Sequence, residues 1–235
     1  TEEDTDLEDL IRLAGKVAGA SKRRGKVHVS VAAFVPKSHT PFMWWPQVSI
    51  EESRRRIQFI QNSIRNPRIR VKWNQPEMSW LEGVFARGDR RLTAVLVQAW
   101  LMGARFDAWS ESFRLDVWQE AFRRTGVDPG FYLHRLRELS EVLPWDHIDC
   151  GVTKEYLEKE WKRALQGEGT PDCRKGCLDC GVCDHKEVDP VLFPEWLPLS
   201  KEKGAAPAEE NDRVTKMRIA FSKSGPAKYL SHLEL

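Results

Sequence analysis

Apolar residues recur at helical spacing near the start of the chain. The recurring positions are Leu7, Leu10, Ile11, Ala14, Val17 and Ala18. Acidic residues are concentrated in residues 2–9, where carboxylates stabilise the first turn of a helix. Gly25 is typical of a position just beyond a helix end. The pattern therefore predicts a helix over this stretch that ends before Gly25.

Strand patterns alternate with helical patterns up to residue 75. Residues 27–35 are β-rich and almost wholly apolar, as expected of a buried parallel strand. A second helix is predicted from Ile50 to about Ile64, and Pro67 ends it. The alternation over residues 69–73 predicts a second strand. Helix, strand, helix, strand is the order of an α/β fold with parallel strands.

After Pro76 the pattern changes to helices rich in tryptophan. We predict helices over residues 81–103 with a break at Gly88, and over 113–124, 129–139 and 154–165. The expected core includes Val29, Val31, Val95, Leu96 and Trp100. Residues 198–212 are polar and contain Pro, Gly and small residues, as in a linker. Residues 217–225 predict a strand and a turn that open a further domain.

Composition excludes several classes of protein. Of 235 residues, 41% are hydrophobic and 31% charged, which is typical of a globular protein, and the net charge of +2 argues neither for nor against a polyanionic partner. No apolar run is long enough to cross a membrane. Phosphate-binding loops, dinucleotide fingerprints and nucleophile elbows are absent from the sequence. Without a signal peptide, we expect a cytoplasmic protein.

Four closely spaced cysteines carry the clearest chemical signal. Disulfides between such near neighbours would strain the short loops, whereas thiolates are good ligands for soft metals. Gly176 and Gly181 lie where a backbone folding around a metal needs unusual φ. Cys150 is the one other cysteine in the chain. We expect one metal centre held by Cys173, Cys177, Cys180 and Cys183.

The spacing leaves the identity of the metal open. Residues 177–183 match three consecutive ligands of a bacterial ferredoxin run, C-x₂-C-x₂-C. A zinc site usually has two knuckles separated by a longer spacer, and only one knuckle is present. Residues 173–180 have the C-x₃-C-x₂-C spacing of a radical S-adenosylmethionine (SAM) cluster, but they follow the folded body instead of a first strand. We favour a closed iron–sulfur site, with zinc as the alternative.

Five phrases of the chain resemble a known family. They are FVPKSHTPF (residues 34–42), WLEGVFARGDRR (80–91), FDAW (106–109), LPWDHID (143–149) and TPDC onward (170–183). Together they are similar to the C-terminal half of large bacterial radical SAM proteins, many of which carry a cobalamin-binding-like domain. The tail, residues 217–235, is similar to the opening of a radical SAM-linked domain.

The resemblance implies a fold and a parent activity. Residues 1–75 would be the closing units of a partial (β/α)₆ barrel, residues 76–170 a helical extension, 171–190 the cysteine loop, 191–212 a linker and 213–235 the truncated radical SAM-linked domain. The partners within the parent would be the upstream barrel half and that linked domain. The parent would cleave SAM reductively at a 4Fe–4S cluster whose ligands lie outside this chain.

Candidate ligand-binding residues follow the first predicted strand. Lys37, His39 and Thr40 leave the carboxyl end of a predicted barrel strand, where barrel enzymes bind ligands. They are therefore candidates for contact with SAM or substrate. The other interpretation is that Pro36 and Pro41 simply shape a turn.

Three other charged groups have a structural and a functional interpretation. Residues 54–72 hold seven basic residues and no acidic one, so with Trp73 the segment 54–73 is a candidate RNA contact, although a solvated helix face is favoured. Asp146, His147 and Asp149 are candidate acid–base groups or metal ligands, or position the helix that starts near Thr153. The RGDRR run at residues 87–91 predicts a helix break bearing ion pairs.

Two classes of function remain. The chain is either the distal part of a radical SAM iron–sulfur enzyme acting on an unknown substrate, with RNA or a ribosomal component as the candidate, or a zinc-knuckled helical module. The second would bind RNA or a partner protein without catalysis.

Overall fold

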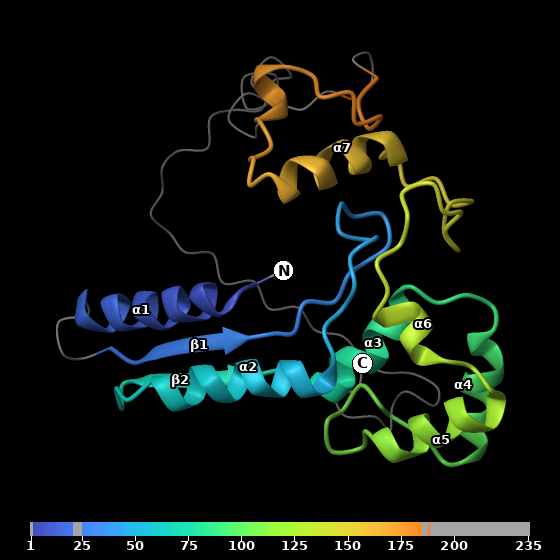
Figure 1. The fold of residues 1–235 in the computed structure, drawn as a ribbon, viewed down its shortest axis with the longest axis horizontal. Coiled ribbons are helices and arrows are strands. Elements are labelled where there is room, and N and C mark those ends of the chain that lie inside the picture. Colours follow the sequence, from blue (N-terminus) through green and yellow to red (C-terminus); the bar gives the residue numbers. More distant parts are fainter. Residues whose placement is uncertain (1, 21–24, 185–187, 189–235) are drawn as a thin grey trace, which may run out of the picture. The chain divides into compact units, whose positions relative to one another are not determined.

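The computed structural model describes residues 2–20, 25–184 and 188 (Figure 1). In chain order the elements are α1 (Asp4–Ala20), β1 (Val27–Val31), α2 (Ile50–Ser63), β2 (Ile69–Trp73), α3 (Pro76–Ala86), α4 (Leu92–Leu101), α5 (Leu115–Thr125), α6 (Pro129–Leu133), α7 (Lys154–Leu165) and a 3₁₀ turn at Cys173–Lys175. The chain divides after Asp189 into two units. The second unit lies outside the described residues, and with it the predicted linker and C-terminal domain.

The two strands pair in parallel, as the sequence predicts. Val27 pairs with Ile69 and Val31 with Trp73. Helices α1 and α2 accompany them, so the order helix, strand, helix, strand is confirmed (Figure 1). A small apolar cluster, with Ala14 and Ala18 of α1 among its members, holds α1 against the sheet.

The predicted barrel does not form, and that prediction is wrong. In the described part of the chain, β1 and β2 pair with each other and with no further strand, and the other regular elements are helical. Strand β1 is also shorter than the predicted 27–35, and only Val29 in it is buried. A run of β-branched residues looks the same in sequence whether its sheet has two strands or closes into a barrel. The pattern alone could not decide between them.

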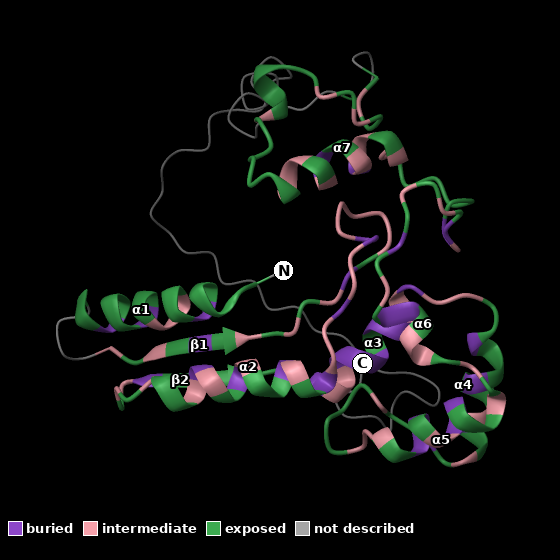
Figure 2. Ribbon diagram, viewed as in Figure 1, coloured by how far each residue is buried: buried purple, intermediate pink, exposed green. Residues whose placement is uncertain are grey.

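Helices α3 to α6 enclose the largest apolar core. Trp80 of α3 meets Phe122 of α5 edge to face, with 5.6 Å between the ring centroids. Helix α3 is buried along much of its length (Figure 2). The predicted break at Gly88 is confirmed, because α3 ends at Ala86 and α4 begins at Leu92. A tryptophan-rich helical region is thus confirmed by the structure.

Helix α6 ends at Leu133, well before the predicted end at residue 139. The backbone N–H of Arg137 donates to the carbonyl of Trp44 over 3.0 Å instead of to a carbonyl of its own helix. The Arg87 guanidinium donates a hydrogen bond to the carbonyl of Leu133 over 2.8 Å. Long-range hydrogen bonds, which periodicity does not report, therefore replace the helical ladder.

The core prediction is partly wrong. Val29 and Val95 are buried, whereas Leu96 is 51% and Trp100 54% exposed. Helix α4 turns Leu92, Val95 and Ala99 inward, and so presents Leu96 and Trp100 to the outside. A helix that is apolar all round gives no sequence signal for which of its faces is buried.

A separate apolar cluster joins the loop after β1 to α7. Met43 and Trp44 pack with Leu143, Trp145 and Leu157. The indole N–H of Trp145 donates to the sulfur of Met43 over 3.4 Å. The cluster thus joins the residues that directly follow phrase 34–42 to the phrase 143–149, which is far away in sequence.

Candidate metal centre

The four candidate thiols lie on an exposed segment after α7. Cys173 and Cys177 are exposed, Cys180 and Cys183 are half-buried, and no disulfide joins any of the cysteines, all of which the structure describes. Cys173 opens the 3₁₀ turn, which Asp172 caps by accepting the backbone N–H of Arg174 at 3.0 Å. The cysteines therefore remain available to a metal.

The segment from Cys177 to Gly181, which we call the knuckle, is organised by a hydrogen bond to sulfur and by two left-handed residues. The backbone N–H of Asp179 donates to Cys177 Sγ over 3.4 Å. Asp179 and Gly181 are left-handed, with φ of 53° and 94°. Hydrogen bonds to sulfur stabilise thiolate and tune a cluster that it binds. The Cys177 thiol in turn donates to Asp179 Oδ1 over 3.6 Å, so ligation of a metal by Cys177 would require the thiol to lose this proton.

Helix α7 anchors the knuckle. The backbone N–H of Thr153 donates to the carbonyl of Cys180 over 2.9 Å, while the Thr153 hydroxyl caps α7 by accepting the Tyr156 N–H at 3.3 Å. Burial raises the pKa of the Tyr156 hydroxyl, and the charges of Glu160, Cys180 and Cys173 add to this. Cys173 and Cys180 thus lie within electrostatic reach of one phenol on α7.

The thiols are not gathered into a coordination sphere. Across residues 2–20, 25–184 and 188, no three His, Cys, Asp or Glu side chains are grouped so that they could hold a metal ion. Metal sites are rarely preformed without their ion, because unscreened thiolates repel one another. The donor set and the knuckle fit a soft metal, and the loop would have to close around it.

One cavity is lined by residues from two sets of candidates. It has a volume of about 370 Å³ and is lined by His39, Asp146, His147, Asp149 and Cys150, among others. His39 adopts a φ of 55°, which is unusual for a residue other than glycine and is found at functional sites. The two imidazoles, predicted from separate phrases, therefore face one space.

The two aspartates of this phrase make local hydrogen bonds. Asp146 accepts the N–H of Leu143 at 2.9 Å and pairs with Lys154 at 2.6 Å, at the start of α7. Asp149 accepts the N–H of Gly151 at 2.7 Å. These bonds support the interpretation that the phrase positions the following helix.

The other ligand candidates after β1 have partners within the protein. Lys37 forms an ion pair with Glu82 of α3. The Thr40 hydroxyl donates to the carbonyl of Lys37 at 2.8 Å and closes the turn. Their contact with SAM or substrate stays a prediction.

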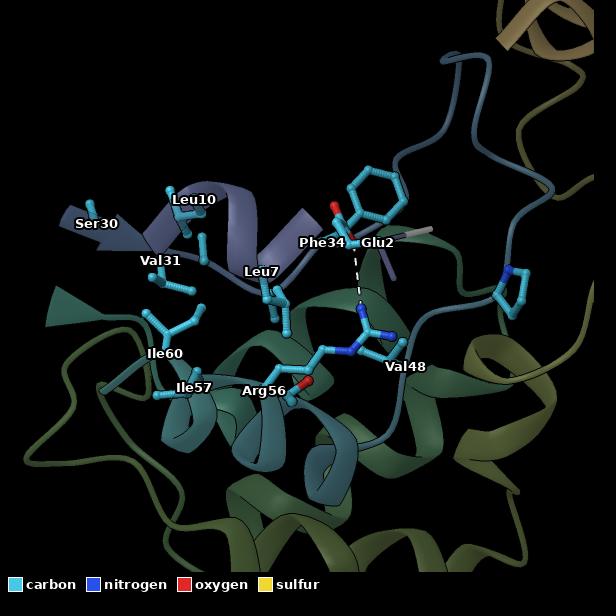
Figure 3. Close-up of a pocket in the computed structure, with 14 residues that line it drawn as sticks. Glu2, Leu7, Leu10, Ser30, Val31, Phe34, Val48, Arg56, Ile57 and Ile60 are labelled. Carbon is cyan, nitrogen blue, oxygen red and sulfur yellow. Dashed lines mark ion pairs between the residues drawn. The ribbon is translucent and has the colours of Figure 1, made fainter. Parts of the chain in front are cut away.

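Another, largely apolar cavity of about 240 Å³ lies at the carboxyl end of β1 (Figure 3). Leu7 of α1, Val31 of β1 and Ile57 of α2 point into it. Glu2 and Arg56, 3.6 Å apart, pair across its side. Lys37, His39 and Thr40 are not among its lining residues.

The part of the basic segment 54–73 that lies on α2 is ion-paired. Arg54 pairs with Glu77, and Arg55 with Glu52 and Asp4. Asp4 and Glu77 are distant in sequence, so the sequence could not show that they are near, whereas Glu52 lies one helical turn before Arg55. These ion pairs support the solvated interpretation for α2, and an RNA contact of the segment stays a prediction. In the described part of the chain, no helix is both long and apolar enough to span a membrane.

Two buried arginines were not foreseen. The predicted helix break does bear an ion pair, Asp89 with Arg91 at 2.6 Å. Arg87, however, is completely buried, and Arg137 is 3% exposed. Charged side chains are so seldom buried that no sequence rule would have found them.

Comparison with known proteins gives one relative and no family. The chain is 34% identical over 100 residues to the uncharacterized protein MJ0966 of Methanocaldococcus jannaschii. The match covers 41% of this chain and 20% of that relative. No family model and no solved structure matches. The chain thus spans about a fifth of the curated relative that it matches.

Proposed function

We propose that Cys173, Cys177, Cys180 and Cys183 hold one iron–sulfur centre, and that the chain is the distal part of a radical SAM enzyme. The observation that carries the metal proposal is the knuckle, in which the Asp179 N–H donates to Cys177 Sγ at 3.4 Å. The radical SAM assignment is supported by the sequence phrases described above. The chain matches a fifth of a longer relative, which is compatible with the chain being a segment of a larger protein.

The chain's own residues would hold and position the centre. Four thiolates supply a full ligand set for a closed cluster. The hydrogen bond from Thr153 to Cys180 ties the loop to α7, so the centre would be fixed relative to the cavity of His39 and His147. A thiolate-bound cluster requires a reducing compartment, and we accordingly propose a cytoplasmic location. The substrate of the parent is not specified by these residues.

The test is metal analysis of the chain purified without oxygen. We expect iron and sulfide, with visible absorption that bleaches on reduction. Cys180→Ser should lose the centre yet keep most helical circular dichroism, because the apolar cores contain none of the cysteines. The matched control is Cys150→Ser, which should retain the centre. Absence of any bound metal would overturn the proposal.

Two further outcomes discriminate between functions. One colourless zinc per chain would refute the iron–sulfur centre and favour a non-catalytic helical binding module. The chain alone should not form 5′-deoxyadenosine from SAM, because the cluster that cleaves SAM is proposed to lie elsewhere in the parent. Its formation would assign the radical chemistry to Cys173, Cys177 and Cys180 instead.

A further inference from the structure

We propose that the outer side of helix α4 is the interface of a symmetric dimer of this chain. We call this surface the α4 face. Its members are the large apolar side chains that are exposed on α4 and on the loop that follows it, Leu96, Val97, Trp100, Leu101, Phe106 and Trp109. The inference goes beyond the proposed metal centre and uses none of its residues.

Helix α4 is apolar on two opposite sides. Its inner side, with Leu92, Val95 and Ala99, belongs to the main apolar core, where α4 contacts α5. On its outer side, positions 93, 96, 97, 100 and 101 have the spacing i, i+3, i+4, i+7, i+8 that is typical of a helix face buried in a core. Four of these positions hold members of the α4 face, which are exposed (Figure 2). The outer side therefore has the pattern of a buried face but is open to solvent.

The loop after α4 extends this face with two aromatic rings. The loop begins against the helix, because the Arg105 guanidinium lies 4.6 Å from the centroid of the Trp100 ring. Phe106 and Trp109 follow in a turn that is closed by a hydrogen bond from the Trp109 N–H to the Phe106 carbonyl, at 2.9 Å. Phe106 has a φ of 57°, and such uncommon backbone conformations are concentrated at functional sites. The turn thus presents two aromatic side chains beside the end of α4.

The apolar area of the α4 face is that of one half of a dimer interface. Its six side chains are between 49% and 77% exposed. With about 150–250 Å² for a whole aromatic side chain and about 60–120 Å² for an aliphatic one, the face exposes about 500 Å² of apolar surface. A standard interface buries about 800 Å² per partner, of which about 65% is apolar in homodimers. The area of the α4 face is therefore sufficient for a stable dimer.

The absence of charge from α4 suits a two-fold axis. Residues 92–104 contain no Asp, Glu, Lys, Arg or His. In a symmetric dimer a residue near the axis faces its own copy, so a charge there would meet a like charge. Thr93 and Ala94, which are small, are also exposed on α4 and allow a second helix to approach closely. A second copy of the α4 face is thus a complementary partner for the first.

A lipid surface matches these features less well. A helix that lies on a membrane has a polar side with Lys and Arg that meets the head groups and water. The side of α4 opposite the α4 face is packed in the core instead. Arg105, the first basic residue after the helix, donates to the carbonyls of Trp100 at 2.7 Å and Ala104 at 2.6 Å. The second copy is therefore the occupant that we assign.

The test is analytical ultracentrifugation of the full chain over a range of concentrations. We expect a dimer that dissociates on dilution. Val97→Glu should raise the dissociation constant of the dimer at least about a hundredfold, because it places like charges opposite each other. Trp100→Ala introduces no charge and should raise the dissociation constant about tenfold, because it removes an aromatic anchor. Both side chains are exposed, so circular dichroism should show that both variants keep the fold.

The matched control is Val17→Glu in α1, because Val17 is 48% and Val97 49% exposed. This variant should dimerise like the wild type. A wild-type chain that stays monomeric, one that forms assemblies larger than a dimer, or an equal loss with Val17→Glu would overturn the proposal. A monomer that co-sediments with phosphatidylcholine vesicles would also overturn it and assign the face to lipid. Cys180→Ser should still dimerise, which separates this test from that of the metal centre.

Discussion

Gly83 in α3 should not tolerate a methyl group. A Cβ built there would lie 1.9 Å from Gln47 Oε1 and 2.8 Å from Leu133 Cδ2. Both neighbours are buried, Gln47 at 4% and Leu133 at 0% exposure. Gln47 is also held at two points, because its Nε2 donates to the carbonyl of Ser79 and its backbone N–H to that of Leu133, each at 2.8 Å. The amide cannot withdraw without losing a buried hydrogen bond.

The opposing energies can be compared for Gly83→Ala. Alanine in a helix interior is favoured over glycine by about 1 kcal/mol. Overpacking costs about 1–3 kcal/mol, and a buried hydrogen bond lost costs about 1–3 kcal/mol. The costs of overpacking and of the lost hydrogen bond exceed the gain in helix propensity, so we expect a net destabilisation of about 3 kcal/mol. In a chain of this length that corresponds to a fall in Tm of about 6–12 °C.

The assay is thermal and urea unfolding followed by circular dichroism. The matched control is Gly15→Ala in α1, where no atom lies within 4 Å of the new Cβ. That variant should gain up to about 1 kcal/mol. The double variant Gly83→Ala/Gln47→Ala should lose less than the sum of its parts, because Gln47 is the main obstacle. Gly83→Ala as stable as the wild type would refute the reasoning.

Three further predictions concern acid stability, helix capping and the metal knuckle. Hydrogen bonds from Arg91 lower the pKa of Asp89 to about 2, so its contribution to stability is present above the ordinary value of 3.8 and is lost as pH falls toward 2. Asp89→Asn should therefore flatten the acid side of a plot of Tm against pH, and an unaltered profile would contradict this. Thr153→Ala removes the cap of α7 and should cost about 1 kcal/mol, which Thr153→Ser should restore; equal stability of all three proteins in urea unfolding would disprove the cap. Gly181→Ala should lower metal content, because φ is 94° and the Cβ would lie 2.8 Å from Thr153 Cγ2. Gly167→Ala, also at positive φ but with open space, should not lower metal content, and equal losses would argue against a specific knuckle.

Local patterns predicted most of the elements. Helix α7 is found at the predicted residues 154–165, because its periodicity is bounded by a Thr153 cap. Helix α2 follows Ser49, whose hydroxyl accepts the Glu52 N–H, and ends close to the predicted position before Pro67. The break at Gly88 could also be predicted from the sequence, because glycine is a poor helix former. Each of these signals lies within a few residues of the feature that it predicts.

Features that depend on distant residues were mispredicted or missed. The size of the sheet, the exposed face of α4 and the early end of α6 follow from long-range packing. The basic residues of α2 looked unpaired because Asp4 and Glu77 lie outside the segment. His39 and His147 share a cavity only because Met43 and Trp145 pack together.

The sequence by itself therefore determined most of the helices, the parallel strand pair and the spacing of the four thiols, because periodicity, caps and spacing are local properties of the chain. The tertiary structure alone decided that two strands make the whole sheet of the described residues, that Arg87 and Arg137 are buried and that the basic residues of α2 pair with distant carboxylates. The physical reason is that burial and ion pairing depend on which distant segments meet, and a one-dimensional pattern carries no record of that contact.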